Sequence, residues 1–180
     1  MKTVKIISLF LISLFLLTAC QSKWKLDVEL TPEERQATLN DIEELKLTIQ
    51  NYDGEEGTIP HLDIISLARD YEKLGDLKKV EQLYLSYLNQ GYKTKNIIHN
   101  LGRLYEKVGD YEKAILQYQR LVDEYHDDDY FYDITWAYIR AKNRLMAEKT
   151  FNLWQNFKHK TDLQTQEALK KLRAEEKGEE

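Results

Sequence analysis

The feature that most constrains the fold of this chain is an internal repeat. Residues 67–84 align with residues 101–118 at an offset of 34, and nine of the eighteen aligned positions are identical. About one identity would be expected by chance from ordinary amino-acid frequencies. A period of this length is typical of repeat architectures, in which each unit buries its apolar face against its neighbours.

Within each copy the spacing of apolar residues predicts two helices joined by a tight turn. In the second copy the apolar positions recur at helical spacing on both sides of the turn: Ile98, Leu101, Gly102, Tyr105, then Ala114, Tyr118, Leu121 and Val122. Gly109 is expected to take the left-handed conformation that ends the first helix, and Asp110 to cap the second. The first copy has the same order around Gly75 and Asp76.

The run Leu101-Gly102-x2-Tyr105, followed by Ala114-x3-Tyr118, resembles the tetratricopeptide repeat. The first copy departs from that pattern at Ala68 and Val80. A third, weaker copy comes one residue early, has Asn143 as its expected cap, and lacks both the turn glycine and a closing proline; its apolar positions are Phe131, Ile134, Tyr138, Ala147 and Phe151. The resemblance implies an all-α tetratricopeptide helix–turn–helix solenoid of about three repeats.

The flanking segments predict a capping helix at each end of the repeats. Thr31-Pro32-Glu33-Glu34 has the pattern of a capping box with proline in the first turn, so residues 30–57 are expected to form an N-terminal capping helix and a loop. Its apolar stripe consists of Leu39, Ile42, Leu45, Ile49 and Tyr52. Three repeats would fill residues 58–160, at about 61–94, 95–127 and 128–160. A second capping box, Thr161 with Gln164, predicts a C-terminal helix and acidic tail over residues 161–180, with Leu163, Leu169 and Leu172 on its apolar side.

The first twenty residues predict export and lipid anchoring. A short basic start is followed by an uncharged apolar run that is too short to span a bilayer, which indicates a signal peptide at residues 1–19. The run ends in Leu17-Thr18-Ala19-Cys20, which resembles the bacterial lipoprotein box and implies that Cys20 is the lipid-bearing first residue of the mature chain. Residues 20–29 would then be a tether. Gln21 leaves the outer membrane as the expected address in a two-membrane cell, and the outer face of the cytoplasmic membrane otherwise.

Composition and motifs argue against a catalytic site. The formal net charge is −5, so a nucleic-acid partner is not expected. No nucleophile motif, phosphate loop, dinucleotide fingerprint or helical histidine pair occurs, so neither a metal nor a cofactor is expected. Asp127-Asp128-Asp129 with Asp133 could collect a calcium ion but lacks the alternating ligands of a calcium loop, and a hydrated turn is favoured. Packing accounts for the tyrosines before sugar stacking does, because five of the twelve fall on repeat core positions: Tyr71, Tyr84, Tyr105, Tyr118 and Tyr138.

The resemblance also implies a binding groove, which in such proteins is lined by the first helix of each repeat. The positions expected to face it are Arg69, Lys73, His99, Arg103, Lys107, Tyr132, Trp136 and Arg140. The alternative is that Arg69 pairs with Glu72, and Arg103 with Glu106, as neutralising i,i+3 ion pairs on a solvated face.

The function expected from the sequence is therefore non-catalytic. The protein would be a lipoprotein adaptor or scaffold that holds a protein or peptide partner in the bacterial cell envelope, with the membrane contacted through the N-terminal lipid. A structural subunit that associates with itself as a homo-oligomer is the alternative. A hydrolase with an unrecognised site has the least support.

Overall fold

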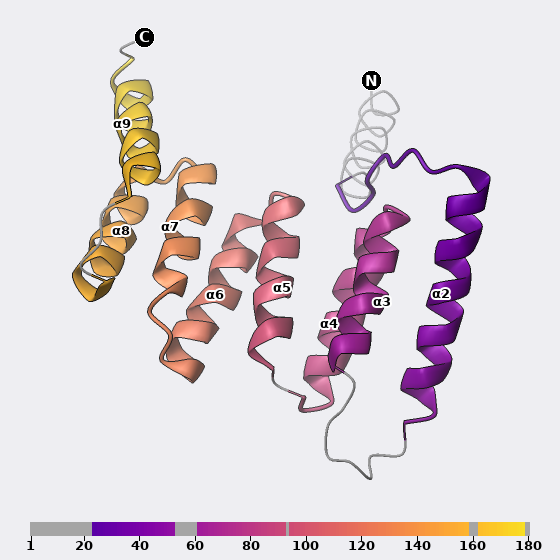
Figure 1. Cartoon of the computed structure of the whole chain (residues 1–180). Helices are drawn as coiled ribbons and strands as arrows, with labels where there is room; N and C mark the ends of the chain where they lie inside the picture. Colours follow the sequence, from indigo (N-terminus) through magenta and orange to yellow (C-terminus); the bar gives the residue numbers. More distant parts are fainter. Residues whose placement is uncertain (1–22, 53–60, 93, 159–161, 179–180) are drawn as a thin grey trace, which may run out of the picture. The chain divides into compact units, whose positions relative to one another are not determined.

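The computed structural model describes residues 23–52, 61–92, 94–158 and 162–178, and these residues form eight helices (Figure 1). The predicted signal peptide and Cys20 lie outside the described residues. The helices, in chain order, are α2 (Pro32–Gln50), α3 (His61–Lys73), α4 (Leu77–Asn89), α5 (Lys95–Lys107), α6 (Tyr111–Tyr125), α7 (Tyr130–Arg140), α8 (Arg144–Lys158) and α9 (Leu163–Lys177). The expectation of an all-α helical repeat fold is confirmed.

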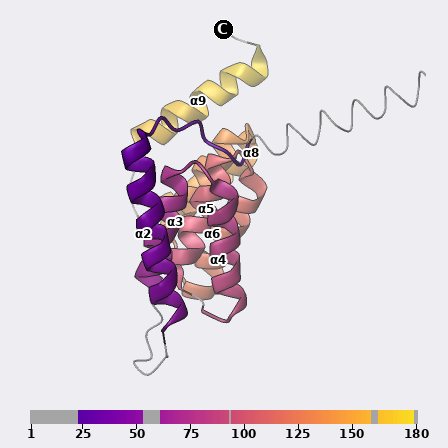
Figure 2. The ribbon, with the colours of Figure 1, turned by 90° about the vertical axis from the view of Figure 1, so that its right-hand side faces the viewer.

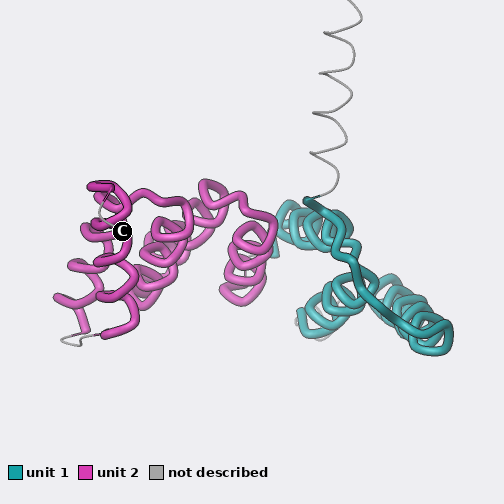
Figure 3. Tube along the Cα trace, turned by 90° about the horizontal axis from the view of Figure 1, so that it is seen from above, with its two compact units in different colours: residues 1–92 teal, residues 93–180 magenta. Residues whose placement is uncertain are grey.

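The chain forms two compact units, coloured separately in Figure 3. Unit 1 comprises Met1–Tyr92 and contains α2, α3 and α4, whereas unit 2 comprises Lys93–Glu180 and contains α5 to α9. In each unit consecutive helices pack against one another. The three helix pairs α3–α4, α5–α6 and α7–α8 correspond to the three sequence repeats.

The turns inside the three helix pairs share one backbone conformation. The central residue has a positive φ in each case, 77° at Gly75, 75° at Gly109 and 56° at Lys142. The N–H of the following residue donates to the carbonyl of a tyrosine five residues earlier, namely Tyr71, Tyr105 and Tyr138 in turn. This bonding satisfies carbonyls at a helix end that would otherwise lack a partner. The third repeat therefore forms the same turn without glycine, with Lys142 in the left-handed region.

The caps after these turns agree with the sequence in part. Asp76 accepts a hydrogen bond from the backbone N–H of Lys79, and Asn143 accepts one from that of Met146 at 3.2 Å. Asp110 occupies the N-cap position of α6 as expected, but its side chain makes no capping hydrogen bond and pairs instead with Lys113 at 3.3 Å.

The core of each repeat consists of the apolar stripes seen in the sequence. In unit 2, Ile98, Leu101, Ala114, Tyr118 and Leu121 are completely buried. A Cβ at Gly102 would lie 2.5 Å from a ring carbon of Tyr118, so α5 and α6 approach as closely as they do only because residue 102 has no side chain. The small residue of the repeat pattern thus sets the distance between the paired helices.

α2 packs along α3 and begins with the predicted capping box, in which Thr31 and Glu34 each accept a backbone hydrogen bond from the other (Figures 1 and 2). Its predicted apolar stripe is buried only in part. Ile42 is 2% exposed, but Leu39 is 40% exposed and the nearby Thr38 is buried in its place. Packing against one neighbouring helix covers a narrower stripe than the sequence pattern suggested.

The N-terminal segment before α2 is bonded to the first repeat and is not a free tether in its described part. The N–H of Leu26 donates to the carbonyl of Gly75 at 3.0 Å, and the N–H of Leu77 donates to the carbonyl of Trp24 at 3.1 Å. Lys25 and Asp76 form an antiparallel bridge between these bonds. The Gly75 carbonyl and the Leu77 N–H of the α3–α4 turn find partners in this segment, which the sequence pattern alone did not indicate.

α9 starts one residue later than the sequence suggested, because Asp162 rather than Thr161 is its N-cap. The Asp162 carboxylate accepts the backbone N–H of Thr165 at 2.8 Å, while Thr161 lies outside the described residues. Leu169 and Leu172 are buried as predicted, whereas Leu163 is 75% exposed. None of the helices in the described part of the chain is both long and apolar enough to cross a bilayer.

Candidate functional site: an aromatic and charged hollow in unit 2

Unit 2 contains an open hollow of about 440 Å³, which we call the unit-2 hollow. Its lining side chains come from α5 (His99, Arg103, Glu106), α7 (Tyr132, Asp133, Trp136, Arg140) and α9 (Gln164). Five of the eight groove residues predicted from the sequence are therefore brought together here. Their position on the first helices of two successive repeats follows from the period of the sequence.

Charged side chains from α5 and α7 join across this hollow. Arg140 donates to Glu106, and its guanidinium lies 5.7 Å from the centre of the Trp136 ring. Glu106 also accepts a hydrogen bond from the hydroxyl of Tyr118 at 3.1 Å. Glu106 is thus bound by a residue from the next repeat and by a core tyrosine.

The i,i+3 pairing offered as the alternative from the sequence is not what the described residues show. Their ion pairs include neither Arg69 with Glu72 nor Arg103 with Glu106. Glu106 pairs with Arg140 of the next repeat. Arg103 is exposed at the hollow and takes part in no ion pair with the described residues. Its guanidinium therefore remains available for a carboxylate from outside the chain.

Two titratable groups in the hollow are shifted toward their neutral forms. Burial first, and then the charge of Glu106, raise the pKa of Asp133 to about 6 against the opposing charges of Arg103 and Arg140. Burial also lowers the pKa of His99, and the positive charges of Arg103 and Lys95 lower it further. At neutral pH the imidazole is therefore uncharged, and the Asp133 carboxyl titrates just below neutrality.

The aromatic side of the hollow continues into the core of the third repeat. Tyr132 meets Trp136 edge to face with ring centres 6.4 Å apart, and its ring centre lies 5.1 Å from that of Trp154. The Tyr132 hydroxyl donates to Asp162 at 3.2 Å, at the start of α9. Packing and hydrogen bonding thus hold Tyr132 in place, and the Trp136 ring forms part of the lining.

The other predicted groove residues lie elsewhere. Arg69 and Lys73 line a separate hollow of unit 1, between α2 and α3, where four carboxylates surround them: Asp41, Glu44, Asp63 and Asp70. Lys73 pairs with Asp70 at 2.6 Å. Lys107 is exposed at the end of α5 and does not line the unit-2 hollow. The expected basic ladder is therefore interrupted by acidic groups in unit 1.

Two of the four aspartates considered as a calcium cluster are paired with lysines. Asp127 accepts from Lys95, and Asp129 pairs with Lys158 at 2.8 Å. His126, just before them, ends α6 in the left-handed conformation with φ 53°. Among the described residues no group of three or more histidine, cysteine, aspartate or glutamate side chains is arranged to hold a metal ion.

Three lining residues, Glu106, Asp133 and Gln164, were not predicted from the sequence as part of the site. Asp133 could have been found by spacing, because Asp133, Trp136 and Arg140 recur at i, i+3 and i+7 on one face of α7. Gln164 had no such signal, since only the packing of α9 brings it to the hollow.

Comparison with known proteins agrees with this geometry. A family model of the tetratricopeptide repeat matches residues 97–129, which cover α5, α6 and the turn that follows. A crystal structure of a tetratricopeptide repeat protein from Parabacteroides merdae resembles 79% of this chain with a TM-score of 0.62 and 22% sequence identity. These findings show a tetratricopeptide repeat match over residues 97–129 and a tetratricopeptide-like helical repeat fold over most of the chain.

This chain corresponds to 56% of the length of the Parabacteroides merdae protein chain. No curated protein matches it significantly. Tetratricopeptide repeats generally bind protein partners. Of the residues that line the unit-2 hollow, His99, Arg103 and Glu106 lie within the matched range, and the others follow it in the chain.

Proposed function

We propose that this tetratricopeptide repeat protein is a lipid-anchored adaptor of the bacterial cell envelope, and that the unit-2 hollow binds a segment of its protein partner. The observation that carries the proposal is that the exposed Arg103 and the Trp136 ring line the same open hollow. Arginine and tryptophan are enriched among the residues that dominate protein interfaces.

The chemistry of the hollow favours a segment with a carboxylate next to an aromatic or other flat side chain. Arg103 can bind a carboxylate through two parallel hydrogen bonds. Trp136 and Tyr132 provide the flat apolar surface beside it. Glu106 is already bound by Arg140 and the Tyr118 hydroxyl, so its charge is partly balanced before a partner arrives.

The envelope location rests on the sequence of the N-terminus. Leu17-Thr18-Ala19-Cys20 is the lipoprotein-type motif, and Cys20 is the only cysteine in the chain. A cysteine carrying two or more acyl chains holds a protein firmly at a bilayer. The outer membrane is the proposed address in a cell with two membranes, and the outer face of the cytoplasmic membrane otherwise.

The binding proposal is tested by crosslinking in the native envelope, followed by identification of the captured protein. Arg103→Ala and Trp136→Ala should weaken capture by about 2 kcal/mol or more, as expected for residues at the centre of an interface. Both variants should keep their helicity, because the buried core does not include either side chain. Glu112→Ala, on the exposed side of α6, is the matched control.

Two results would contradict the binding proposal. Full capture by both variants would remove the unit-2 hollow from the interface, and capture of nothing but further copies of this chain would favour the self-associating subunit instead. The anchoring proposal is tested separately by Cys20→Ser, which should release the protein from the membrane fraction or stop its processing.

A further inference from the structure

The described N-terminal segment holds Trp24 against the α3–α4 turn through backbone contacts. The Trp24 carbonyl accepts the N–H of Leu77, and two residues later the N–H of Leu26 donates to the carbonyl of Gly75. A Cβ at Gly75 would collide with the Leu26 carbonyl oxygen. The backbone of Leu26 can therefore pack against the turn only because residue 75 has no side chain. The position of Trp24 relative to this turn is therefore set by the fold.

The length of chain between Trp24 and the proposed anchor is short. Trp24 follows Cys20 by four residues, and four fully extended residues span at most about 14 Å. α4 runs away from the turn for 13 residues, a length of about 20 Å. A lipid on Cys20 thus reaches the turn end of unit 1 more readily than the opposite end, where α4 finishes.

The side chains at the turn end have the chemistry of a bilayer interface. The ammonium groups of Lys78 and Lys23 lie 4.8 and 5.7 Å from the centre of the Trp24 ring. The side chains of Lys78 and Lys79 are both about half exposed, at 53% and 55%. Tryptophan is enriched at the headgroup level of membranes, and lysine is attracted to anionic headgroups.

Carboxylates accompany these lysines. Asp76 pairs with Lys79 at 2.9 Å, and Glu81 pairs with Lys78. Four lysines, at positions 23, 25, 78 and 79, stand closest to the Trp24 ring and the turn, and the exposed Asp27 and Glu29 follow further along the N-terminal segment. The opposite end of α4 carries no charged residue from position 86 to position 92. Within unit 1, α2 also begins at the turn end (Figure 1).

We propose that the α3–α4 turn, with Trp24 and the surrounding lysines, is a membrane-facing surface that rests on phospholipid headgroups beside the lipidated Cys20. This inference rests on the lipid anchor proposed above. It gives unit 1 a defined orientation, in which α4 starts at the bilayer surface and ends away from it. The partner of this surface is the anionic phospholipid of the anchoring membrane.

Two positions on one exposed face of α4 provide a matched pair for the test. Gln82 and Asn89 are both exposed and lie seven residues apart, which places them on the same side of the helix about 10 Å apart along its axis. Gln82→Cys and Asn89→Cys in the full-length lipoprotein are labelled with a fluorophore. Each protein is then reconstituted into vesicles of phosphatidylethanolamine and phosphatidylglycerol that contain a phospholipid with a nitroxide on its headgroup.

The expected result is loss of most of the fluorescence at position 82 and retention of most of it at position 89. Adding Gly75→Ala, which forces the N-terminal segment off the turn, should remove the difference, whereas Gly109→Ala in unit 2 should not. Equal quenching at both positions, or stronger quenching at position 89, would overturn the orientation while leaving the anchor intact. If mass spectrometry finds no lipid on Cys20, the proposed anchor fails, and the inference that rests on it fails with it.

Discussion

Arg140 on α7 donates a hydrogen bond to Glu106 on α5, thirty-four residues earlier in the chain. The pair joins the first helices of two successive repeats in unit 2, and its separation is one residue more than the 33-residue offset between the second and third copies. The Arg140 side chain is 46% exposed, and ion pairs this exposed contribute little to stability. The pair instead fixes the Arg140 guanidinium, which lies 5.7 Å from the centre of the Trp136 ring.

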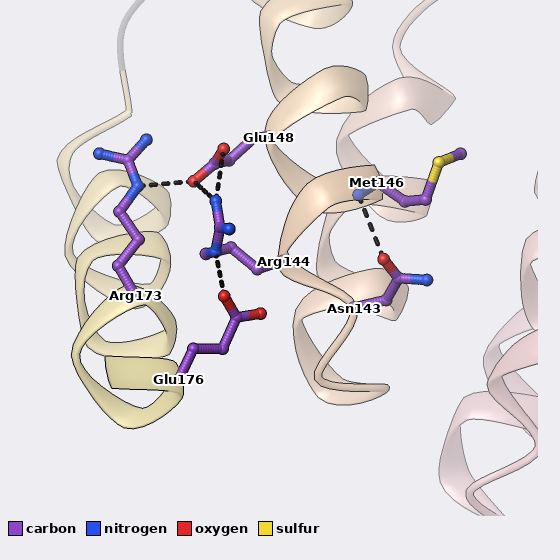
Figure 4. A network of polar contacts seen from close by, with 6 residues as sticks. All are labelled: Asn143, Arg144, Met146, Glu148, Arg173 and Glu176. Atoms are coloured by element: carbon purple, nitrogen blue, oxygen red, sulfur yellow. Dashed lines mark hydrogen bonds and ion pairs between the residues drawn. The ribbon is translucent and has the colours of Figure 1, made fainter. Parts of the chain in front are cut away.

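A second polar network fixes α9 on α8 (Figure 4). Glu148 accepts from Arg144 at 3.0 Å and from Arg173 of α9 at 2.6 Å, and Arg144 also donates to Glu176 at 2.6 Å. Burial by itself would raise the pKa of Glu148, but the hydrogen bonds from the two arginines outweigh it and hold the pKa below its usual range. The carboxylate therefore stays charged and keeps both arginines in place.

We expect Glu148→Gln to loosen α9 while the rest of unit 2 stays folded, because one neutral amide cannot satisfy two guanidinium groups. Amide hydrogen exchange should become faster across residues 163–177 and remain unchanged in α5 and α6. Lys149→Gln, at the next and exposed position of α8, is the control. Unchanged exchange in α9 would show that its buried leucines alone hold it.

Substitutions at two turn glycines should separate backbone strain from a steric collision. Gly75 and Gly109 have nearly the same φ, 77° and 75°, so alanine at either position adds left-handed strain of about 1–2 kcal/mol. A methyl group at Gly109 would have no neighbouring atom within 4 Å, whereas a methyl group at Gly75 would collide with the Leu26 carbonyl. Chemical denaturation should find Gly75→Ala clearly less stable than Gly109→Ala. Equal losses would mean that the N-terminal segment does not pack on the turn.

Gly102→Ala should destabilise the protein although alanine is the better helix former. The added methyl group would lie 2.5 Å from the fully buried Tyr118 ring, and overpacking of a core typically costs about 1–3 kcal/mol. The tyrosine would have to move, which would also weaken its hydrogen bond to Glu106. A urea denaturation curve measures the loss. A variant as stable as the wild type would show that α5 and α6 can separate without cost.

Titration of Asp133 should make stability fall as the pH rises. Its pKa is about 6 in the folded protein, above the usual aspartate value, so between about pH 4 and pH 6 the folded state keeps a proton that the unfolded chain releases. Stability from this group is therefore fully present below that window and lost as the pH rises through it. The free energy of unfolding of the wild type relative to Asp133→Asn should fall by roughly 2 kcal/mol across the window.

The comparison with Asp133→Asn isolates this group from others of opposite sign. Asp162 has a lowered pKa, because the Thr165 side chain donates to it, and stability from such a group is lost as the pH falls. That effect is common to both proteins and cancels in the difference. Denaturation curves at several pH values supply the measurement. A constant difference between pH 4 and pH 7 would mean that Asp133 is not shielded from water.

The sequence alone determined the repeat, its helices and its turns. Helical spacing and the size of single residues are local properties. The positive φ at Gly109 and the close contact at Gly102 could therefore be predicted from position in the repeat, and the capping box at Thr31 from the residues around it. The lack of glycine in the third turn did not change its conformation, because Lys142 was brought into the same hydrogen bonding by the helix that precedes it.

The pairing of charged side chains depends on the tertiary structure. Glu106 has Arg103 three residues before it on its own helix, yet it binds Arg140 of the next repeat, and helical spacing cannot tell an i,i+3 pair from such a bond. The bond between Arg140 and Glu106, the shielding of Asp133 and the docking of Leu26 on Gly75 each depend on how closely two separate elements approach. That distance is set by the packing of the whole unit, because long charged side chains adapt to the helices around them rather than determine where those helices lie.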